Sequence, residues 1–212
     1  MEPMCGSGRF LVEFAKRGFD IDGFDLSPDM INRCEGKIKG VNCAGQLSCC
    51  DFSAYHPERR YDFIFIAAGS FCLLIEEKDI LFSFSQMKDW LQPGGRILME
   101  IETDLNYRNK STEGENNSTR SVKENAVAII FKSNTSYDSV KSVAYSQNSY
   151  ELFEKGVFVA KEEEDFYLKL YRKNEFETFV AAAGLIIQNS YTDFTKNKFH
   201  GQDSESIIYL LT

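Results

Sequence analysis

The amino-acid sequence predicts an α/β fold: a mostly parallel, seven-stranded sheet with flanking helices, plus an inserted antiparallel β segment. Three observations predict this class. Strands alternate with helices over the first hundred residues, as in βαβ units. A glycine-rich turn stands immediately before the first expected helix. After residue 104 the chain becomes polar and then strand-like, which indicates the antiparallel segment.

The elements of the first half follow from local patterns. Apolar residues recur at helical spacing from residue 8 until Gly18, which ends the first helix. Ser27 suits an N-cap, and Pro28 suits the first position of the second helix. The run 61–68 is almost continuously apolar, which is typical of a parallel strand covered on both faces. In chain order, we expect a helix at 8–17, a strand at 20–25, a helix from 27, strands at 46–50 and 61–68, a helix at 76–91 and a strand at 96–102.

The second half of the chain has a different texture. Residues 104–120 are rich in Asn, Ser, Thr and Glu, which predicts a loop. We expect all 212 residues to form one domain, with about 104–171 as an inserted antiparallel subdomain. Its strands are expected at 122–132, 139–150, 150–160 and 166–171, followed by a helix at 173–183 and strands at 185–191 and 206–211.

Composition narrows the classes of partner. The formal net charge is −8, so the surface repels phosphate backbones and nucleic acid is not an expected partner. No apolar run approaches the roughly 18 residues of a membrane span, and no membrane association is expected. The six cysteines and two histidines lack the spacing of a disulfide framework or a metal site. We therefore expect reduced thiols, a cytoplasmic location and no metal.

The opening turn and a later acid have the spacing of a nucleotide-type site. Gly6 and Gly8 form a turn that would present backbone N–H groups at the positive end of a helix. Asp25 follows Gly8 by seventeen residues, at the tip of the second strand. A carboxylate there can accept from two neighbouring ribose hydroxyls. On their own, the two glycines are equally compatible with a plain tight turn.

A dinucleotide cofactor such as NAD is the obvious rival. Its GxGxxG/A fingerprint would begin at Gly6 and requires a small residue at position 11. Leu11 stands there instead and would hold the helix and strand too far apart. An NAD-dependent oxidoreductase is therefore the less favoured reading.

Taken together, these segments resemble class I S-adenosylmethionine (SAM)-dependent methyltransferases, which have a Rossmann-like fold. Residues 2–9 resemble the motif that holds the methionine part of SAM, and residues 25–30 resemble the motif of the ribose and adenine. Residues 50–52 resemble a third motif, 67–71 the segment that borders the sulfonium and the acceptor, and 91–95 the turn before the fifth strand. The resemblance covers residues 1–102 and returns at 173–212.

The resemblance implies roles for individual residues. Asp25 would bind the ribose and Leu26 would lie beside the adenine; Asp51 would accept from the adenine amino group, with Phe52 flanking the ring. The residues implied in cofactor binding are Glu2, Met4, Cys5, Gly6, Ser7, Gly8, Asp25, Leu26, Met30, Asp51, Phe52, Ala67, Ala68 and Gly69.

Two features depart from the family pattern. Members usually have Gly where Met4 stands, and a side chain there would crowd or redirect the methionine part. The chain also begins inside the first motif, so we expect an N-terminal segment that caps the cofactor to be lacking. The cofactor pocket would then be open on one side.

The sequence thus predicts a SAM-dependent methyltransferase that acts on a small molecule, with a nitrogen acceptor favoured over oxygen. Phe71, Tyr107 and His200 are the candidate acceptor contacts, and no residue declares itself as the catalytic base. In related methyltransferases a sheet in the place of 104–171 covers the active site; here it could equally serve a homodimer, so both a monomer and a homodimer are open. The alternative functions are a SAM-binding module without catalysis and the NAD-dependent oxidoreductase. Transfer to protein or RNA is disfavoured by the acidic charge.

Overall fold

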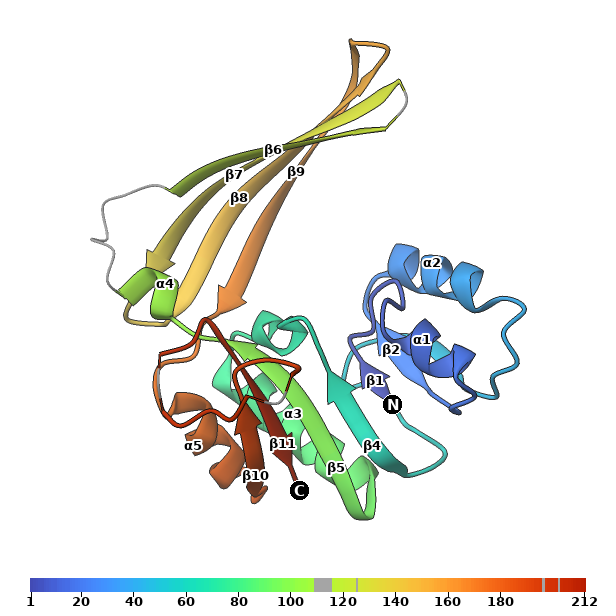
Figure 1. Cartoon of the computed structure of the whole chain (residues 1–212), viewed down its shortest axis with the longest axis vertical. Coiled ribbons are helices and arrows are strands. Elements are labelled where there is room, and N and C mark those ends of the chain that lie inside the picture. The colour runs from blue at the N-terminus through green and yellow to red at the C-terminus, as the bar shows by residue number, and fades with distance from the viewer. Residues whose placement is uncertain (109–115, 125, 196, 202) are drawn as a thin grey trace.

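The structure is a computed structural model that describes residues 1–108, 116–124, 126–195, 197–201 and 203–212. Within these ranges the chain forms an α/β part and a separate antiparallel sheet that rises from one end of it (Figure 1). The α/β part contains β1 (Glu2–Pro3), α1 (Leu11–Lys16), β2 (Gly23–Asp25), α2 (Pro28–Ile38), β3 (Leu47–Cys49), β4 (Tyr61–Ile66), the 3-10 turn η1 (Ser70–Leu73), α3 (Glu77–Trp90), β5 (Leu91–Glu102), α5 (Glu175–Ala182), β10 (Ile187–Tyr191) and β11 (Ser206–Leu211).

The strands of the α/β part form two sheets that meet at Met1. β1, β2 and β3 are parallel, and β4 pairs in parallel with β5. β11 is antiparallel to β5 and to β10, which makes the second sheet mixed. The nitrogen of Met1 donates to the Phe63 carbonyl at 2.8 Å, and Phe65 N–H donates to the Met1 carbonyl at 3.0 Å. The expected single, mostly parallel sheet is therefore corrected to a three-stranded and a four-stranded sheet that these two bonds join.

Two hydrophobic cores lie on opposite faces of β4. Ile64 and Ile66 are buried in the larger core, with residues of α3, α5 and β5. Phe65 points the other way, into a smaller core with residues of α1 and α2. This division follows from the alternation of side chains along a strand. The apolar run predicted as a strand covered on both faces is confirmed.

Local signals set the helix ends. Ser27 Oγ accepts from Met30 N–H at 3.3 Å, and Pro28 is the first residue of α2, as predicted. The predicted turn at 93–95 falls instead within the first residues of β5, beside a register shift in the β4–β5 pairing. None of the helices that the structure describes is long and apolar enough to cross a membrane.

The antiparallel sheet, called the arm below, stands at the end of the α/β part where β5 ends (Figure 1). Its strands are β6 (Asn116–Glu124), β7 (Val127–Asp138), β8 (Val143–Glu154) and β9 (Val157–Lys169), in that spatial order. A short helix, α4 (Leu105–Arg108), precedes it. The expected antiparallel insertion is present, but the expected break at 150 lies within β8, and β6 takes residues 116–120 from the predicted loop. Residues 109–115 of that loop lie outside the described residues.

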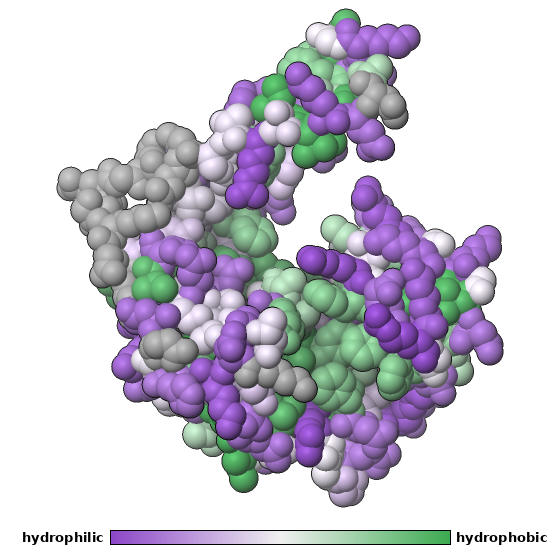
Figure 2. All heavy atoms as spheres, viewed as in Figure 1, coloured by the Kyte–Doolittle hydropathy of each residue, from purple (hydrophilic) through white to green (hydrophobic). Residues whose placement is uncertain are grey.

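The chain leaves the α/β part for the arm and returns from it at one place. Tyr171 N–H, after β9, donates to the Glu102 carbonyl at the end of β5, at 2.9 Å. Asp104 N–H, on the entering chain, donates back to the Tyr171 carbonyl at 3.2 Å. On the arm side, Lys169 Nζ binds Glu175 Oε1 of α5 at 2.5 Å. Figure 2 shows an open space between the arm and the α2 side of the molecule.

Candidate functional site

The glycine-rich turn between β1 and α1 contains three residues with a left-handed backbone. Met4 has φ +56°, Gly6 φ +53° and Gly8 φ +75°. A Cβ on Gly8 would lie 2.3 Å from Cys34 Sγ, so only glycine lets the turn pack this closely on α2. The positive φ at Met4 is the physical reason why glycine suits this position. The Met4 side chain is half-buried against the larger core.

Asp25 ties this turn to the end of β2. Its Oδ2 accepts from Gly6 N–H at 2.7 Å, and its Oδ1 accepts from Ser27 N–H at 3.0 Å. The structure therefore brings together the two motifs that the sequence separated by nineteen residues. It also corrects one expectation: the turn does not offer a row of open N–H groups, because Gly6 donates to Asp25 and Gly8 donates to the Cys5 carbonyl.

The neighbours of Asp25 form an exposed apolar edge. Leu26 is 71% exposed and Met30 is 42% exposed, both beyond the end of β2. On the other side of the turn, Lys37 of α2 donates from Nζ to the carbonyl and to Oγ of Ser7, at 2.7 and 2.8 Å. Cys5 is buried beneath the turn. A flat apolar group could rest on the side chains of Leu26 and Met30 while its polar part faces Asp25.

Glu2 is a buried carboxylate below the turn. It is 4% exposed, and its Oε2 has no hydrogen-bond partner among the described residues. Burial raises the pKa of Glu2 to about 8, although a hydrogen bond with the Leu11 backbone opposes the shift. An unsatisfied buried carboxylate oxygen is costly unless a donor reaches it. A cationic ligand group such as an ammonium is a suitable donor.

The third predicted segment is only partly at the surface. Asp51 is exposed, and its Oδ1 accepts from Ser53 N–H at 2.8 Å and from Ser53 Oγ at 2.6 Å. These hydrogen bonds lower the pKa of Asp51. Phe52 is 7% exposed, and its ring stacks on Trp90 with centroids 5.9 Å apart. The expectation that Phe52 flanks a bound ring does not fit this place in the core.

The segment after β4 lies against two glutamates of β5. Ala68 is exposed with φ +56°, and its N–H donates to Glu100 Oε2 at 2.8 Å. A Cβ on Gly69 would lie 2.9 Å from Glu102 Oε1, so glycine allows the close approach of this carboxylate. Ala67 is half-buried at the end of the strand. The segment therefore forms a surface with two carboxylates beside it.

Sequence reasoning missed Glu100 and Glu102. They alternate with buried Met99 and Ile101 on β5, so both project to the same face. Burial, followed by the charges of Glu100 and Glu205, raises the pKa of Glu102. The sequence pattern could have identified them: acids at alternating positions of an otherwise apolar strand are unusual, because carboxylates are rarely buried.

The candidate acceptor contacts are not gathered at one point. Phe71 is fully buried against Phe84, with ring centroids 5.0 Å apart, which corrects its predicted role at an acceptor. Tyr107 is half-buried and packs on Tyr137 of the arm at 5.3 Å. His200 is exposed on the chain between β10 and β11. In the described part of the chain, no group of three or more His, Cys, Asp or Glu side chains is arranged to hold a metal ion.

Comparisons with known proteins find methyltransferases that are similar to this chain. Residues 1–95, which run from β1 into the start of β5, match the family described as methyltransferase domain. Among curated proteins, one from Geobacillus sp. (strain WCH70) named as a methyltransferase is 25% identical over 99 residues; the match covers 47% of this chain and 40% of that protein. YqeM of Bacillus subtilis (strain 168), also named as a methyltransferase, is 20% identical over 219 residues, covering 96% of this chain and 83% of YqeM.

Solved structures share the whole fold. A SAM-dependent methyltransferase from Clostridium acetobutylicum ATCC 824 matches with a TM-score of 0.81 and 19% identity, over 100% of this chain and 82% of that one. The sugar N-methyltransferase KedS8 from Streptoalloteichus sp. ATCC 53650 matches with a TM-score of 0.76 and 16% identity, over 98% and 77%. The chain therefore has the α/β fold of these methyltransferases.

Proposed function

We propose that this protein binds SAM and transfers its methyl group to a small-molecule amine. The observation that carries the proposal is the hydrogen bond from Gly6 N–H to Asp25 Oδ2, which holds the carboxylate directly against the glycine-rich turn. Both elements stand at the carboxyl ends of parallel strands, where α/β proteins bind nucleotides. The methyltransferase-domain match over residues 1–95 supports this reading over an NAD-dependent one.

The residues of the site suit the parts of SAM. Glu2 Oε2 would accept from the ammonium of the methionine part, which removes the cost of its missing partner. Asp25 would accept from ribose hydroxyls with the lone pairs that Gly6 and Ser27 leave open. Leu26 and Met30 would cover one side of the adenine. Bound SAM would supply an electrophilic methyl group on a sulfonium.

The two β5 glutamates favour nitrogen as the acceptor atom. An amine must lose its proton before its lone pair can attack, and a carboxylate of raised pKa is a competent base near neutral pH. Glu102 has such a pKa and lies against Gly69, and Glu100 is fixed by Ala68 N–H. In the proposed step Glu102 takes the proton and the nitrogen forms the new bond to carbon, while the carbon–sulfur bond breaks. KedS8, named for sugar N-methylation, supports an amine on a small molecule.

We further propose that the arm covers the acceptor side of the site. Its exit strand is bonded to Glu102 through Tyr171, so the arm begins beside the proposed base. The protein would act in the cytoplasm as a monomer or a homodimer, without nucleic acid or membrane partners, in agreement with its net charge of −8.

Isothermal titration calorimetry with SAM, S-adenosylhomocysteine and NAD tests the cofactor. We expect micromolar binding of SAM or S-adenosylhomocysteine and none of NAD. Binding of NAD alone would favour the oxidoreductase. Turnover with a panel of primary and secondary amines, followed by mass spectrometry, then separates an enzyme from a SAM-binding module without catalysis.

A further inference from the structure

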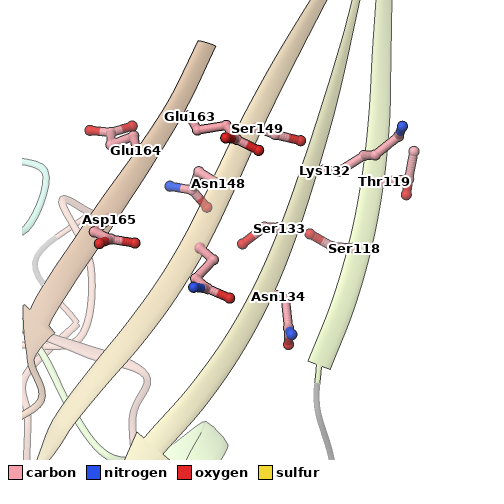
Figure 3. A pocket seen from close by; sticks show the side chains of 11 residues that line it. Ser118, Thr119, Lys132, Ser133, Asn134, Asn148, Ser149, Glu163, Glu164 and Asp165 are labelled. Carbon is pink, nitrogen blue, oxygen red and sulfur yellow. The ribbon is translucent and has the colours of Figure 1, made fainter. Parts of the chain in front are cut away.

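The arm contains a polar hollow that the proposed cofactor site does not use. Its volume is about 670 Å³, within the range of small-molecule sites. Figure 3 shows that the side chains around it come from all four strands of the arm. They are serines, a threonine, asparagines, a glutamine, a lysine and three acids, with no aliphatic or aromatic side chain among them. Such a lining offers hydrogen-bond partners to a ligand that carries several polar groups.

A buried amide in the hollow lacks a partner. Asn148 lies between Ser133 of β7 and Glu164 of β9 in the strand register. It is only 9% exposed, yet its Oδ1 has no hydrogen-bond partner among the described residues. Buried polar atoms are nearly always paired, and an unpaired one is costly. A ligand that places a donor at this atom would remove that cost.

The charges of the hollow select the kind of donor. Side chains alternate between the two faces of a strand, so Asn148 shares its face with the paired Ser133 and Glu164, and Glu164 brings a negative charge to that face. Lys132 projects from the other face, where its ammonium binds Glu151 Oε1 at 2.7 Å. An anionic group such as a phosphate would therefore meet net repulsion. Hydroxyl groups both donate and accept, so they match amides, hydroxyls and carboxylates together.

We propose that this hollow binds a sugar unit that is rich in hydroxyls and carries an amine or no charge. The inference deepens the proposed function, because the sugar would be a part of the methyl acceptor that lies remote from the methylated atom. Asp165 precedes Tyr171, the contact of Glu102, by six residues of extended chain. At about 3.3 Å per residue this is roughly 20 Å, so the acceptor would be longer than one sugar ring.

Nuclear magnetic resonance titration of the ¹⁵N-labelled full chain tests the hollow without SAM. The probes are glucosamine, glucose and glucose 6-phosphate. We expect the amide signals of Ser133, Asn148 and Glu164 to shift with glucosamine most strongly, with glucose less, and with the phosphate least. No shift of these signals over a titration into the millimolar range, or the strongest shift with the phosphate, overturns the proposal.

Variants assign the binding to side chains. Ser133→Ala and Asn148→Ala should each weaken glucosamine binding about three- to tenfold, the usual effect of one lost hydrogen bond. Ser133 is only half-buried, so its variant keeps the test valid if Asn148→Ala does not fold. Gln188→Ala, an exposed glutamine on β10, is the control and should leave binding unchanged. Equal affinities in Ser133→Ala and Gln188→Ala would contradict the assignment.

Calorimetry with SAM on the same samples separates the two proposals. Retained SAM binding without any sugar response would refute the hollow and leave the methyltransferase proposal standing. A sugar response without SAM binding would refute the cofactor site and leave the hollow as a binding site in its own right.

Discussion

The backbone N–H of Gly6 donates to the carboxylate of Asp25 at 2.7 Å, across nineteen residues of chain. The glycine-rich turn and the acid after β2 are therefore one unit. The shape of the turn depends on the carboxylate, and the carboxylate is oriented by the turn and by Ser27 N–H. Substitution of the acid would remove the proposed ribose contact together with the support of the loop.

Asp25→Ala should weaken SAM binding by about 1–3 kcal/mol, because hydrogen bonds between a charged group and the ribose hydroxyls are lost. Calorimetry measures the change in affinity. Asp29→Ala, an exposed acid in the first turn of α2, is the control and should bind as the parent does. Unchanged affinity of Asp25→Ala would show that the ribose lies elsewhere.

Glu102→Gln should lower kcat by about 10²- to 10⁴-fold, the usual contribution of a general base. Since the base must be ionised, the parent rate should rise as the pH passes through the raised pKa of Glu102. The Gln variant should lose this limb of the pH profile but retain SAM affinity. The exposed Glu154→Gln serves as the control. A variant with the parent rate and the parent profile would exclude Glu102 as the base.

Glu2 should make stability fall with rising pH. Its ordinary pKa of 4.5 is raised to about 8 by burial, so the folded state holds the proton more tightly than the unfolded state. The stabilisation is complete below pH 4.5 and is lost as the pH rises to about 8, by at most about 1.4 kcal/mol per pH unit. Urea unfolding from pH 5 to about 9 should show this slope in the parent and a flatter one in Glu2→Gln.

If Glu2 holds the ligand ammonium as proposed, it should couple cofactor binding to proton release. A ligand ammonium beside Glu2 favours the ionised carboxylate, so SAM binding at pH 7 should release a proton. Calorimetry in two buffers of different ionisation enthalpy measures the release, and Glu2→Gln should abolish it. Equal proton release in the parent and the variant would assign the effect to another group.

Gly8→Ala should destabilise the fold by roughly 2–5 kcal/mol, from the left-handed backbone and the clash with Cys34 Sγ together. Gly18 also has a positive φ, +84°, but a Cβ there meets nothing within 4 Å. Gly18→Ala should therefore cost only the backbone term of about 1–2 kcal/mol. Adding Cys34→Ala to Gly8→Ala should recover part of the loss, as measured by chemical unfolding. If Cys34→Ala does not restore any of the unfolding free energy that Gly8→Ala loses, the clash with Cys34 is excluded as the cause.

The sequence predicted the elements whose signals are local. Ser27 and Pro28 start α2 as expected, and the apolar run of β4 is a strand buried on both faces. The predicted glycine-rich turn is present, and its two glycines have positive φ. These features depend on residues a few positions apart, which a single sequence displays directly.

Features that depend on distant neighbours were missed or misplaced. β6 reads as a polar loop, because a strand with both faces exposed has no apolar alternation and is held by its ladder with β7. Phe52 and Phe71 lie in segments that resemble methyltransferase motifs, but both rings are buried in the hydrophobic core. Glu100 and Glu102 become site candidates only in the folded structure, where the segment after β4 lies against them.

The junction between the arm and the α/β part affects which insertions and deletions such a protein can tolerate. The chain leaves the α/β part at Asp104 and returns at Tyr171, and these two residues are hydrogen-bonded to each other. Because the two ends of the insertion already meet, its interior can lengthen, shorten or be exchanged without moving β5 or β11. The sequence of the arm can therefore change in evolution while the α/β part keeps its structure.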